Sequence, residues 1–400
     1  MSPNTIRIID KWMGQPICFV LTCIRYCLPK SRAKEVKSVL FLKLIEQGAT
    51  VLAYTAIQRA VKMVGKENVY FCVFSDNKPI LDILDVVPQK NIFAIRNHNI
   101  LLFLWDMLGM FIKVRKLGIN STVDMEFFSR ATAIMAYLSG VKMRVGLHRF
   151  NSEQPYRGDL LTHKVQYNPF LHTSKAYLAL VKSLEADPSD LPLLKEIIND
   201  QEIQVPSFVP ADSEAIAVDE LLAKKFSSKV PGKLILLNPN ASDMLPLRKW
   251  PTERFVDLGN RLLAQDNLGI IITGAPSEQD SCQQIANEFG SGRVVSVAGE
   301  TTLRELIVLY GKSDVLVTND SGPGHFATLA NVKTLVLFGP ETPQLFGPLG
   351  DRSVVIWKGL ACSPCVNAFN HRFSPCKDNV CMQEIQVDEV SEKVLGLLEK

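Results

Sequence analysis

The sequence predicts an α/β protein made of two doubly wound domains, each with a parallel sheet between layers of helices. Three observations predict this fold class. The chain has 400 residues, which is enough for two domains that each bury a core of their own. From Val36 onward, short apolar or β-branched runs alternate with segments of helical periodicity, the pattern of βαβ units. A proline-rich, acidic stretch at 185–214 separates two sets of such units.

The expected strands fall into two groups. The first half contains strand-like runs at Ser38–Leu44, Val69–Phe74, Asn91–Ile95, Thr122–Phe127 and Met143–Leu147. The second half contains them at Leu234–Asn238, Gly269–Thr273, Arg293–Val297, Val315–Thr318, Thr334–Phe338 and Ser353–Trp357. These groups place the first domain at 36–205 and the second at 231–386, joined by a linker at 206–230. Apolar residues at helical spacing predict a terminal helix at 387–400.

Two apolar segments of the first half lie beside basic residues. The run Trp12–Leu28 is shorter than the roughly 20 residues that span a bilayer, and it lacks the cleavage site of a signal peptide. A second run, Ile100–Ile112, is followed at once by Lys113, Arg115 and Lys116. An apolar face with adjacent cations is typical of helices that lie on an anionic membrane, and packing against a neighbouring domain is the alternative. We expect a cytoplasmic protein whose segment 1–35 is able to dock peripherally on the inner face of the cytoplasmic membrane.

The overall charge excludes a polyelectrolyte-binding protein. With 44 Lys+Arg against 41 Asp+Glu the formal net charge is +3, so we expect no nucleic-acid partner. Nine cysteines are too few for a disulfide scaffold, which indicates a reducing compartment. Four of them cluster as Cys362, Cys365, Cys376 and Cys381. Their spacing leaves two alternatives open, a structural site for zinc or another metal and a cluster of free thiols.

The segment after the expected strand Val315–Thr318 carries the strongest chemical signal. It contains Asp320, Ser321, Gly322 and His325 and leads into a helix of small residues. Ligands of open parallel sheets bind outside the carboxyl ends of the strands, where amide groups at the start of this helix would meet an anion. The segment therefore predicts a phosphate-binding site. The simpler alternatives are that Asp320 or Ser321 only caps the helix, and that His325 belongs to the core.

Two further strand ends supply groups that a nucleotide needs. Ser242, Arg248 and Lys249 follow the strand Leu234–Asn238, and either cation is able to neutralise a diphosphate. Glu278 follows the next strand, where a carboxylate is able to accept both hydroxyls of a ribose. The alternatives are a solvated basic turn and an acid favoured by the helix dipole. No Asp-x-Asp pair occurs in the sequence to hold a divalent ion, so we expect diphosphate binding without a metal or a cofactor.

Taken together, these segments resemble glycosyltransferase family 9, the ADP-heptose:lipopolysaccharide heptosyltransferase family. The resemblance is carried by Leu237-Asn-Pro-Asn-Ala, Arg248-Lys-Trp-Pro, Thr273-Gly-Ala-Pro-Ser-Glu, Asn319-Asp-Ser-Gly-Pro-Gly-His and Leu337-Phe-Gly-Pro-Glu-Thr-Pro. It implies the GT-B arrangement, in which two Rossmann-like domains face a central cleft. It also implies an inverting, metal-independent transfer of a sugar, heptose by default, from a nucleotide-diphosphate donor such as ADP-heptose. The implied acceptor is a lipopolysaccharide core, a lipid-linked saccharide or another cell-surface glycan.

The resemblance also implies roles for individual residues of the second domain. In the family, the Asp-[Ser/Thr]-Gly-x-x-His segment holds the diphosphate and the sugar of the donor. That role carries over to Asp320, Ser321, Gly322 and His325. The basic residue before Trp-Pro contacts phosphate, which implies Arg248, with Lys249 as the adjacent alternative. The acid after Gly-x-Pro-x contacts the ribose, which implies Glu278.

One departure from the family concerns the catalytic base. Active heptosyltransferases of the family usually carry a Ser-x-Gly-Asp turn after the first strand, and its aspartate deprotonates the acceptor hydroxyl. Here Ala49 follows the glycine. We expect one of three first-domain carboxylates to replace the base, because only carboxylates near the carboxyl end of that sheet are able to reach the acceptor. They are Asp124 and Glu126, ranked first, and Glu46.

Other interpretations remain open at this point. The two strand carboxylates are able to form structural ion pairs with Arg130 or Arg144. If no base exists, the chain is a catalytically degenerate nucleotide-sugar-binding or scaffolding protein of the same fold. A nucleotide-sugar epimerase or hydrolase is the third possibility. The basic segments Arg144–Arg149 and Tyr156–His163 suit an anionic acceptor, and a solvated surface loop is their alternative.

Overall fold

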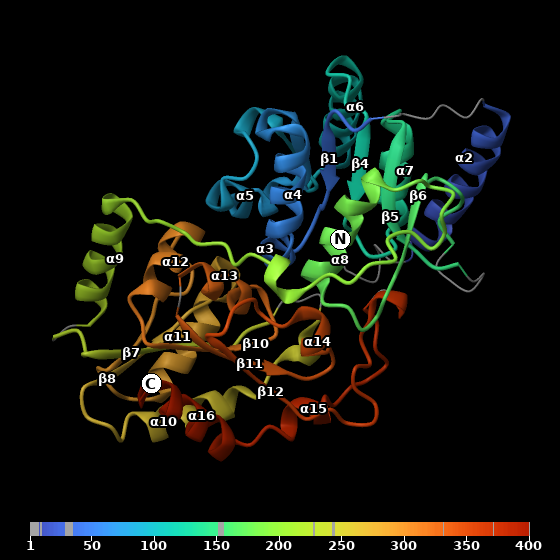
Figure 1. Cartoon of the computed structure of the whole chain (residues 1–400). Helices are drawn as coiled ribbons and strands as arrows, with labels where there is room; N and C mark the ends of the chain where they lie inside the picture. Colours follow the sequence, from blue (N-terminus) through green and yellow to red (C-terminus); the bar gives the residue numbers. More distant parts are fainter. Residues whose placement is uncertain are drawn as a thin grey trace. The chain divides into compact units, whose positions relative to one another are not determined.

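The structure is a computed structural model that describes residues 8, 10–28, 35–150, 156–226, 229–241, 245–330, 332–370 and 372–399. The chain divides into two compact units. The first contains the residues up to Gln204 together with the short segment that starts at Ala368, and the second contains the remaining residues from Val205 onward. Figure 1 shows that each unit is built around a sheet.

The first unit contains a six-stranded parallel sheet with the strand order β3-β2-β1-β4-β5-β6. Its strands are β1 (Val39–Leu42), β2 (Val69–Phe74), β3 (Ile92–Ile95), β4 (Ser121–Asp124), β5 (Met143–His148) and β6 (His163–Gln166). The register pairs Leu42 with Cys72 on one side and with Asp124 on the other, so these strands end side by side. The five strands expected from sequence are confirmed. The sixth strand, β6, was missed because it has only four residues and lies within a polar, basic segment.

Helices cover both faces of this sheet. The longer ones are α2 (Gln15–Cys27), α3 (Gln47–Leu52), α4 (Tyr54–Val64), α5 (Pro79–Leu84), α6 (Ile100–Lys116), α7 (Arg130–Leu138) and α8 (Thr173–Lys182). Short helical turns lie at Asp10–Gly14 (η1), Lys66–Asn68, Ser75–Asn77, Gln89–Asn91, Ser183–Glu185 and Asp200–Glu202. Residues of α6 and α7 pack with β1 and β2 into one hydrophobic cluster. Because both faces are covered, all four residues of β1 are buried rather than every second one.

The second unit repeats this design with the strand order β12-β11-β10-β7-β8-β9. Its strands are β7 (Lys233–Asn238), β8 (Leu268–Ile272), β9 (Val294–Ser296), β10 (Val315–Asn319), β11 (Lys333–Phe338) and β12 (Ser353–Trp357). In both sheets the order reverses once, between β1 and β4 and between β7 and β10. A reversal of this kind leaves a crevice outside the carboxyl ends of the two strands, where ligands of open α/β sheets bind. The prediction of two doubly wound parallel sheets is confirmed.

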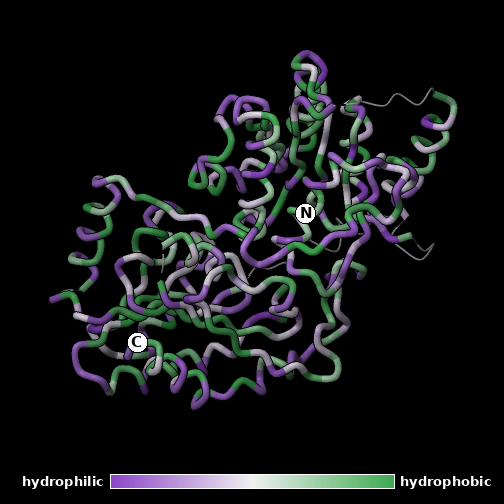
Figure 2. Tube along the Cα trace, in the orientation of Figure 1, coloured by the Kyte–Doolittle hydropathy of each residue, from purple (hydrophilic) through white to green (hydrophobic). Residues whose placement is uncertain are grey.

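The helices of the second unit are divided between the two faces of its sheet (Figure 1). They are α9 (Asp212–Lys225), α10 (Thr252–Leu262), α11 (Gln279–Glu288), α12 (Leu303–Gly311), α13 (Gly322–Ala330), α14 (Pro343–Phe346), α15 (Val380–Gln383) and α16 (Val387–Glu399). Short turns lie at Pro246–Arg248, Pro276–Glu278 and Ala368–Asn370. Figure 2 shows hydrophobic residues along the strands of this unit, and Trp250, fully buried, donates its indole N–H to the Ile385 carbonyl at 2.9 Å.

The helical elements η1, α2 and α6 of the first unit expose large apolar side chains. On η1 and α2, Trp12 is 72% exposed and Phe19 60%, and on α6, Leu101 is 73% exposed and Trp105 70%. The opposite side of α2 is anchored, because Cys18 is buried against α7. Within the described part of the chain, no helix is both long enough and apolar enough to cross a membrane.

Candidate functional site

The reversal point of the second sheet gathers three charged side chains. Arg248 follows β7, Asp320 follows β10 and Glu341 follows β11, so three neighbouring strands each contribute one residue. Their carboxyl ends are level, since Asn319 pairs with Leu337 across β10 and β11. Sequence analysis had selected Arg248 and Asp320. It missed Glu341, although Glu341 lies within a segment that carried the family resemblance.

Arg248 lies between the two carboxyl groups. Its Nε is 3.2 Å from Asp320 Oδ2, and its Nη1 donates to the Asp320 carbonyl at 3.3 Å. Its Nη2 is 3.9 Å from Glu341 Oε2. Asp320 is 3% exposed and Glu341 is fully buried, whereas the Arg248 side chain keeps 14% of its surface exposed. The guanidinium is therefore the part of this cluster that a ligand reaches most easily.

A buried asparagine fixes the loops that carry this cluster. Asn319, the last residue of β10, donates from Nδ2 to the carbonyls of Pro239 and Asn240 at 3.0 and 3.2 Å. Its Oδ1 accepts the backbone N–H of Trp250 at 3.0 Å. One side chain thus joins both ends of the loop after β7 to the end of β10. Arg248, two residues before the anchored Trp250, is held in position by this connection.

Burial makes the two carboxyl groups unusual. It raises the pKa of Glu341 to about 8, while Arg248 opposes the rise and Asp320 adds to it. It also raises the pKa of Asp320, again opposed by Arg248. Asp320 Oδ2 and Glu341 Oε2 each lie in ion-pair range of Arg248 but accept no hydrogen bond from the described part of the chain. Buried polar atoms without hydrogen bonds are rare, and they are typical of sites that a ligand completes.

The helix that starts at this cluster begins earlier than expected. The sequence places Gly322 and His325 in the segment ahead of this helix, whereas α13 begins at Gly322 and includes His325. The first amide groups of a helix have no partner within it and lie at the positive end of its dipole, so the start of α13 suits an anion. Ser321 donates from Oγ to the Asn319 carbonyl at 3.1 Å, and His325, one turn into the helix, is buried.

The remaining donor-side candidates lie on neighbouring loops. Glu278 accepts the backbone N–H of Ala275 at 2.7 Å and directly precedes α11, a position that agrees with the alternative of an acid favoured by the helix dipole. A carboxylate has further lone pairs, so this bond leaves room for a ribose hydroxyl. Lys249, adjacent to Arg248, is half-buried. Ser242 lies outside the described residues.

Among the candidates for the base, Glu126 is the most heavily engaged. Both of its carboxylate oxygens are 3.2 Å from Lys43 Nζ, and Lys43 is fully buried. Oε1 also accepts the backbone N–H groups of Leu44 and Ile45 at 2.8 and 3.2 Å. Glu126 therefore holds the turn that follows β1. Its partner is a lysine next to that turn rather than Arg130 or Arg144.

Asp124, at the end of β4, is enclosed. It is fully buried, and its Oδ1 accepts the backbone N–H of Glu126 at 3.1 Å. Its Oδ2 lies 3.7 Å from Nη1 of Arg157, which is 6% exposed. Burial raises the pKa of Asp124 to about 7, and Arg157 opposes the rise. Asp124 therefore forms a structural ion pair, as one alternative from sequence proposed, but its partner is Arg157 rather than Arg130 or Arg144.

Glu46 is the most accessible of the three carboxylates. It immediately precedes α3 with φ at +70°, a left-handed conformation that is uncommon for a residue other than glycine. Its side chain is 22% exposed, and one oxygen lies 3.5 Å from Lys43 Nζ. Ala49, where the family usually has its aspartate, is a buried residue of α3.

The basic segment after β5 is not a solvated loop. Arg144, Arg157 and His163 are all less than a tenth exposed. Arg144 donates to the carbonyls of Leu160 and Val141, each at 2.6 Å. Burial lowers the pKa of His148 to about 4, so this imidazole is neutral at physiological pH. The interpretation as a solvated surface loop was therefore wrong, because these side chains hold their own backbone together.

The four clustered cysteines range from exposed Cys362 to buried Cys381, and Cys365 Sγ accepts a hydrogen bond from Ser374 Oγ at 3.1 Å. Burial raises the pKa of Cys381 to about 11. Across the described ranges, no group of three or more His, Cys, Asp or Glu side chains is arranged to hold a metal ion.

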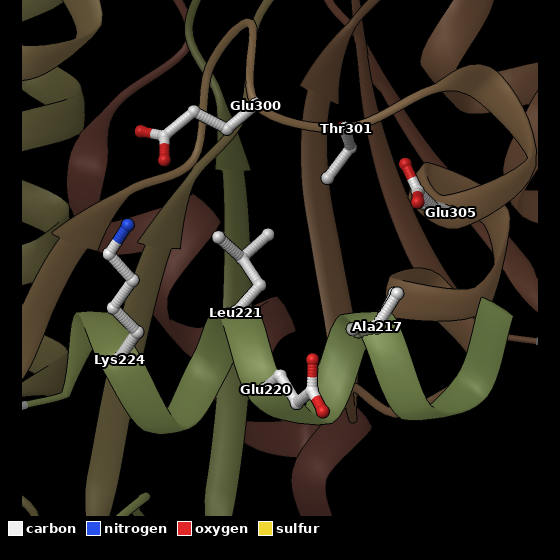
Figure 3. A pocket seen from close by; sticks show the side chains of 8 residues that line it. Ala217, Glu220, Leu221, Lys224, Glu300, Thr301 and Glu305 are labelled. Carbon is white, nitrogen blue, oxygen red and sulfur yellow. The ribbon is translucent and has the colours of Figure 1, made fainter. Parts of the chain in front are cut away.

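A shallow groove of about 280 Å³ lies elsewhere in the second unit. Figure 3 shows Leu221 and Lys224 of α9 facing Glu300 and Thr301, which precede α12. None of the candidate site residues lines this groove.

A model of glycosyltransferase family 9 (heptosyltransferase) matches residues 129–372. Lipooligosaccharide heptosyltransferase 2 of Campylobacter jejuni (strain 81116) is 28% identical over 170 residues, which are 42% of this chain and 52% of the relative. The corresponding Haemophilus influenzae protein is 27% identical over 200 residues, 50% of this chain and 54% of the relative. The chain spans about half the length of the curated relatives it matches.

Two solved structures share the fold. The Escherichia coli ADP-heptose lipopolysaccharide heptosyltransferase II superposes with a TM-score of 0.66 at 17% identity, covering 90% of this chain and 98% of that one. A family 9 glycosyltransferase from Veillonella parvula superposes with a TM-score of 0.67 at 14% identity, covering 92% and 99%. At these identities the likeness extends to the fold alone.

Proposed function

Because this chain belongs to glycosyltransferase family 9, the heptosyltransferase family, we propose that it is a glycosyltransferase that uses a nucleotide-diphosphate sugar. Heptose is the sugar proposed first, carried by ADP, and a lipopolysaccharide-core or lipid-linked saccharide is the acceptor. The relatives named as heptosyltransferases support this choice. The observation that carries the proposal is Arg248, held against Asp320 beside the start of α13, where an anion gains both a cation and helix amide groups.

The reaction we propose is a single displacement. An acceptor hydroxyl oxygen attacks C1 of the donor sugar, the bond from C1 to the diphosphate oxygen breaks, and the configuration at C1 inverts. Negative charge develops on the departing diphosphate. Arg248 and the first amides of α13 stabilise that charge, with Lys249 as a second cation. We propose that no metal takes part, because the sequence has no Asp-x-Asp pair to hold one.

Glu46 is our proposal for the base that takes the acceptor proton. A general base needs an oxygen within hydrogen-bonding distance of the substrate. Glu126 accepts two backbone amides besides the ammonium group of Lys43, and the Asp124 carboxylate is held between the Glu126 amide and Arg157. Glu46 retains exposed surface, and its left-handed backbone conformation is of the strained kind that clusters at functional sites. Placing Glu46 first reverses the ranking made from sequence, in which Asp124 and Glu126 came before it.

The direct test is sugar transfer by the purified protein. ADP-heptose and a truncated lipopolysaccharide core are incubated in the presence of EDTA, and the product and the configuration at its new bond are determined by mass spectrometry and NMR. Formation of an inverted heptosyl product supports the proposal. Release of free heptose without transfer to the core indicates a hydrolase instead, and an altered sugar still attached to ADP indicates an epimerase.

Ala49 supports the second candidate, a nucleotide-sugar-binding or scaffolding protein without catalysis. In that case ADP-heptose binds in a calorimeter but no acceptor is modified. Transfer to any acceptor excludes this candidate.

We also propose peripheral attachment to an anionic membrane through η1, α2 and α6. The support is chemical: these helices expose large apolar side chains such as Trp12 and Trp105, and the exposed Lys113 and Lys116 lie in the last turn of α6. Aromatic side chains with adjacent cations are typical of helices that lie in the headgroup region. An enzyme attached in this way would encounter a lipid-linked acceptor at the membrane surface.

A further inference from the structure

Glu341 has no role in the function described so far. It is fully buried directly after β11, between Pro340 and Pro343, in the short connection to α14. Its Oε1 accepts the backbone N–H of the next residue, Thr342, at 3.3 Å. Among the residues that the structure describes, none donates a hydrogen bond to its Oε2, which lies 3.9 Å from Arg248 Nη2. A carboxyl group held this way costs the fold stability, because burial removes its hydration without supplying full hydrogen bonding.

The charges of the cluster argue that Glu341 does not simply neutralise Arg248. Asp320 already provides one carboxylate for that guanidinium, with Nε at 3.2 Å. A second ionised carboxylate would give the cluster a net negative charge and repel a diphosphate. The raised pKa of Glu341, about 8 through burial, keeps the group mainly neutral at pH 7. A neutral carboxyl has one O–H donor and one carbonyl acceptor, the pair of groups that a sugar hydroxyl also has.

The position of Glu341 relative to Arg248 suits the sugar of the donor. In a nucleotide-diphosphate sugar, C1 of the sugar is bonded directly to a phosphate oxygen. A diphosphate on Arg248 and the start of α13 therefore brings the sugar close to the same guanidinium. Glu341 follows β11 and Asp320 follows β10, so the two carboxyl groups approach this guanidinium from neighbouring strands.

We propose that Glu341 is a sugar-specificity residue, which binds a hydroxyl group of the transferred sugar through its unpartnered carboxyl oxygen. This inference rests on the proposed function of the donor site. It separates the site into a part that holds the diphosphate, Arg248 with the start of α13, and a part that recognises the sugar, Glu341.

Calorimetry with two ligands, ADP and ADP-heptose, tests this separation on the full-length protein with EDTA present. The main variant is Glu341→Met, which keeps the side-chain length and removes the polar atoms. We expect its affinity for ADP-heptose to fall about tenfold or more while its affinity for ADP stays within about twofold of wild type. Glu341→Gln, which retains a donor and an acceptor, should recover most of the loss. Glu253→Gln, an exposed acid at the start of α10, is the matched control.

Thermal unfolding of the same variants separates recognition from a structural role. Replacing a buried carboxyl that accepts one long hydrogen bond by an apolar side chain should leave the melting temperature of Glu341→Met equal to or above that of wild type. A purely structural role predicts a lower melting temperature and unchanged sugar binding. If Glu341→Met fails to fold, Glu341→Gln tests the inference by itself. An amide cannot fully replace a carboxyl that donates to the sugar. We therefore expect Glu341→Gln to lose a measurable part of the affinity for ADP-heptose and none of the affinity for ADP.

Two results overturn the inference while leaving the proposed function intact. Equal losses for ADP and ADP-heptose would mean that Glu341 acts on the diphosphate through Arg248. Unchanged affinity for both ligands would mean that it contacts neither. If wild type binds neither ligand, the donor site itself is wrong, and the proposed function fails together with this inference.

Discussion

Lys43 and Glu126 form a buried ion pair at the carboxyl end of the first sheet, with Nζ 3.2 Å from both carboxylate oxygens. Lys43 is fully buried and also donates to the Ile45 carbonyl at 2.7 Å. The two residues are 83 positions apart in the chain, one after β1 and the other after β4. They close the reversal point of this sheet, and Glu46 lies on the turn that they hold.

Breaking this pair should destabilise the protein. We expect Glu126→Ala to lower the free energy of unfolding by about 3–5 kcal/mol, because it removes a carboxylate whose two oxygens both lie 3.2 Å from the buried Lys43 ammonium group. Urea denaturation of the full chain measures this. The double variant Lys43→Met with Glu126→Met should recover a large part of the loss. An unfolding free energy for Glu126→Ala that matches wild type would contradict the assignment of a structural role.

Glu46→Gln should separate catalysis from stability. If Glu46 is the base, the rate of sugar transfer falls about 10²–10⁴-fold. The free energy of unfolding should stay within about 0.5 kcal/mol of wild type, since the side chain is partly exposed. ADP binding, measured by calorimetry, should not change. Full transfer activity in Glu46→Gln would exclude Glu46 as the base and leave Asp124 as the next candidate.

Arg248 and Lys249 can be distinguished by conservative substitution. Arg248→Lys keeps the charge but loses the planar fork that contacts Asp320 and faces Glu341. We expect its affinity for ADP to fall about 10- to 100-fold, which corresponds to one charge-assisted hydrogen bond. Lys249→Arg should bind ADP as wild type does. The reverse pattern would show that Lys249 is the phosphate ligand.

The buried Glu341 should give stability a characteristic dependence on pH. Burial raises its pKa from 4.5 to about 8, so the folded state holds this proton more tightly than the unfolded state does. The resulting stabilisation is complete below about pH 4.5 and is lost as the pH rises through about 8. We expect the unfolding free energy of Glu341→Gln, measured by urea denaturation from pH 5 to 8, to fall less steeply than that of wild type. Parallel curves would show that Glu341 is ionised throughout.

Membrane attachment through α6 should depend on its exposed apolar face. Trp105→Ala should weaken binding to vesicles of phosphatidylglycerol about tenfold, because it removes a large apolar surface. Raising the salt concentration should weaken wild-type binding further, since Lys113 and Lys116 act through screened charges. Ile197→Ala, an 82% exposed residue outside these helices, serves as the control. Co-sedimentation that Trp105→Ala leaves unchanged would argue that these helices do not bind lipid.

Much of this molecule can be predicted from local pattern. The alternation of apolar runs and helical segments determines both parallel sheets, because each strand must be apolar on both faces to lie between helices. The segment from Asp320 to His325 is also recognisable in the sequence, since a helix start after a strand is a local feature. Short β6 was the exception, because four residues beginning at His163 carry too little apolar signal.

The ion-pair partners and the burial of individual carboxylates could be learned only from the tertiary structure. The sequence offered three carboxylates, with Asp124 and Glu126 ranked above Glu46. The packing encloses Asp124, pairs Glu126 with Lys43 and leaves Glu46 the most accessible. Likewise, nothing local indicates that Glu341 lies beside Arg248. Parallel strands bring together residues that are far apart in the chain, and both the pKa and the availability of a carboxyl group depend on those neighbours. The sequence alone therefore determined the sheets and the strand-end motifs, whereas the role of each carboxylate followed from the packing around it.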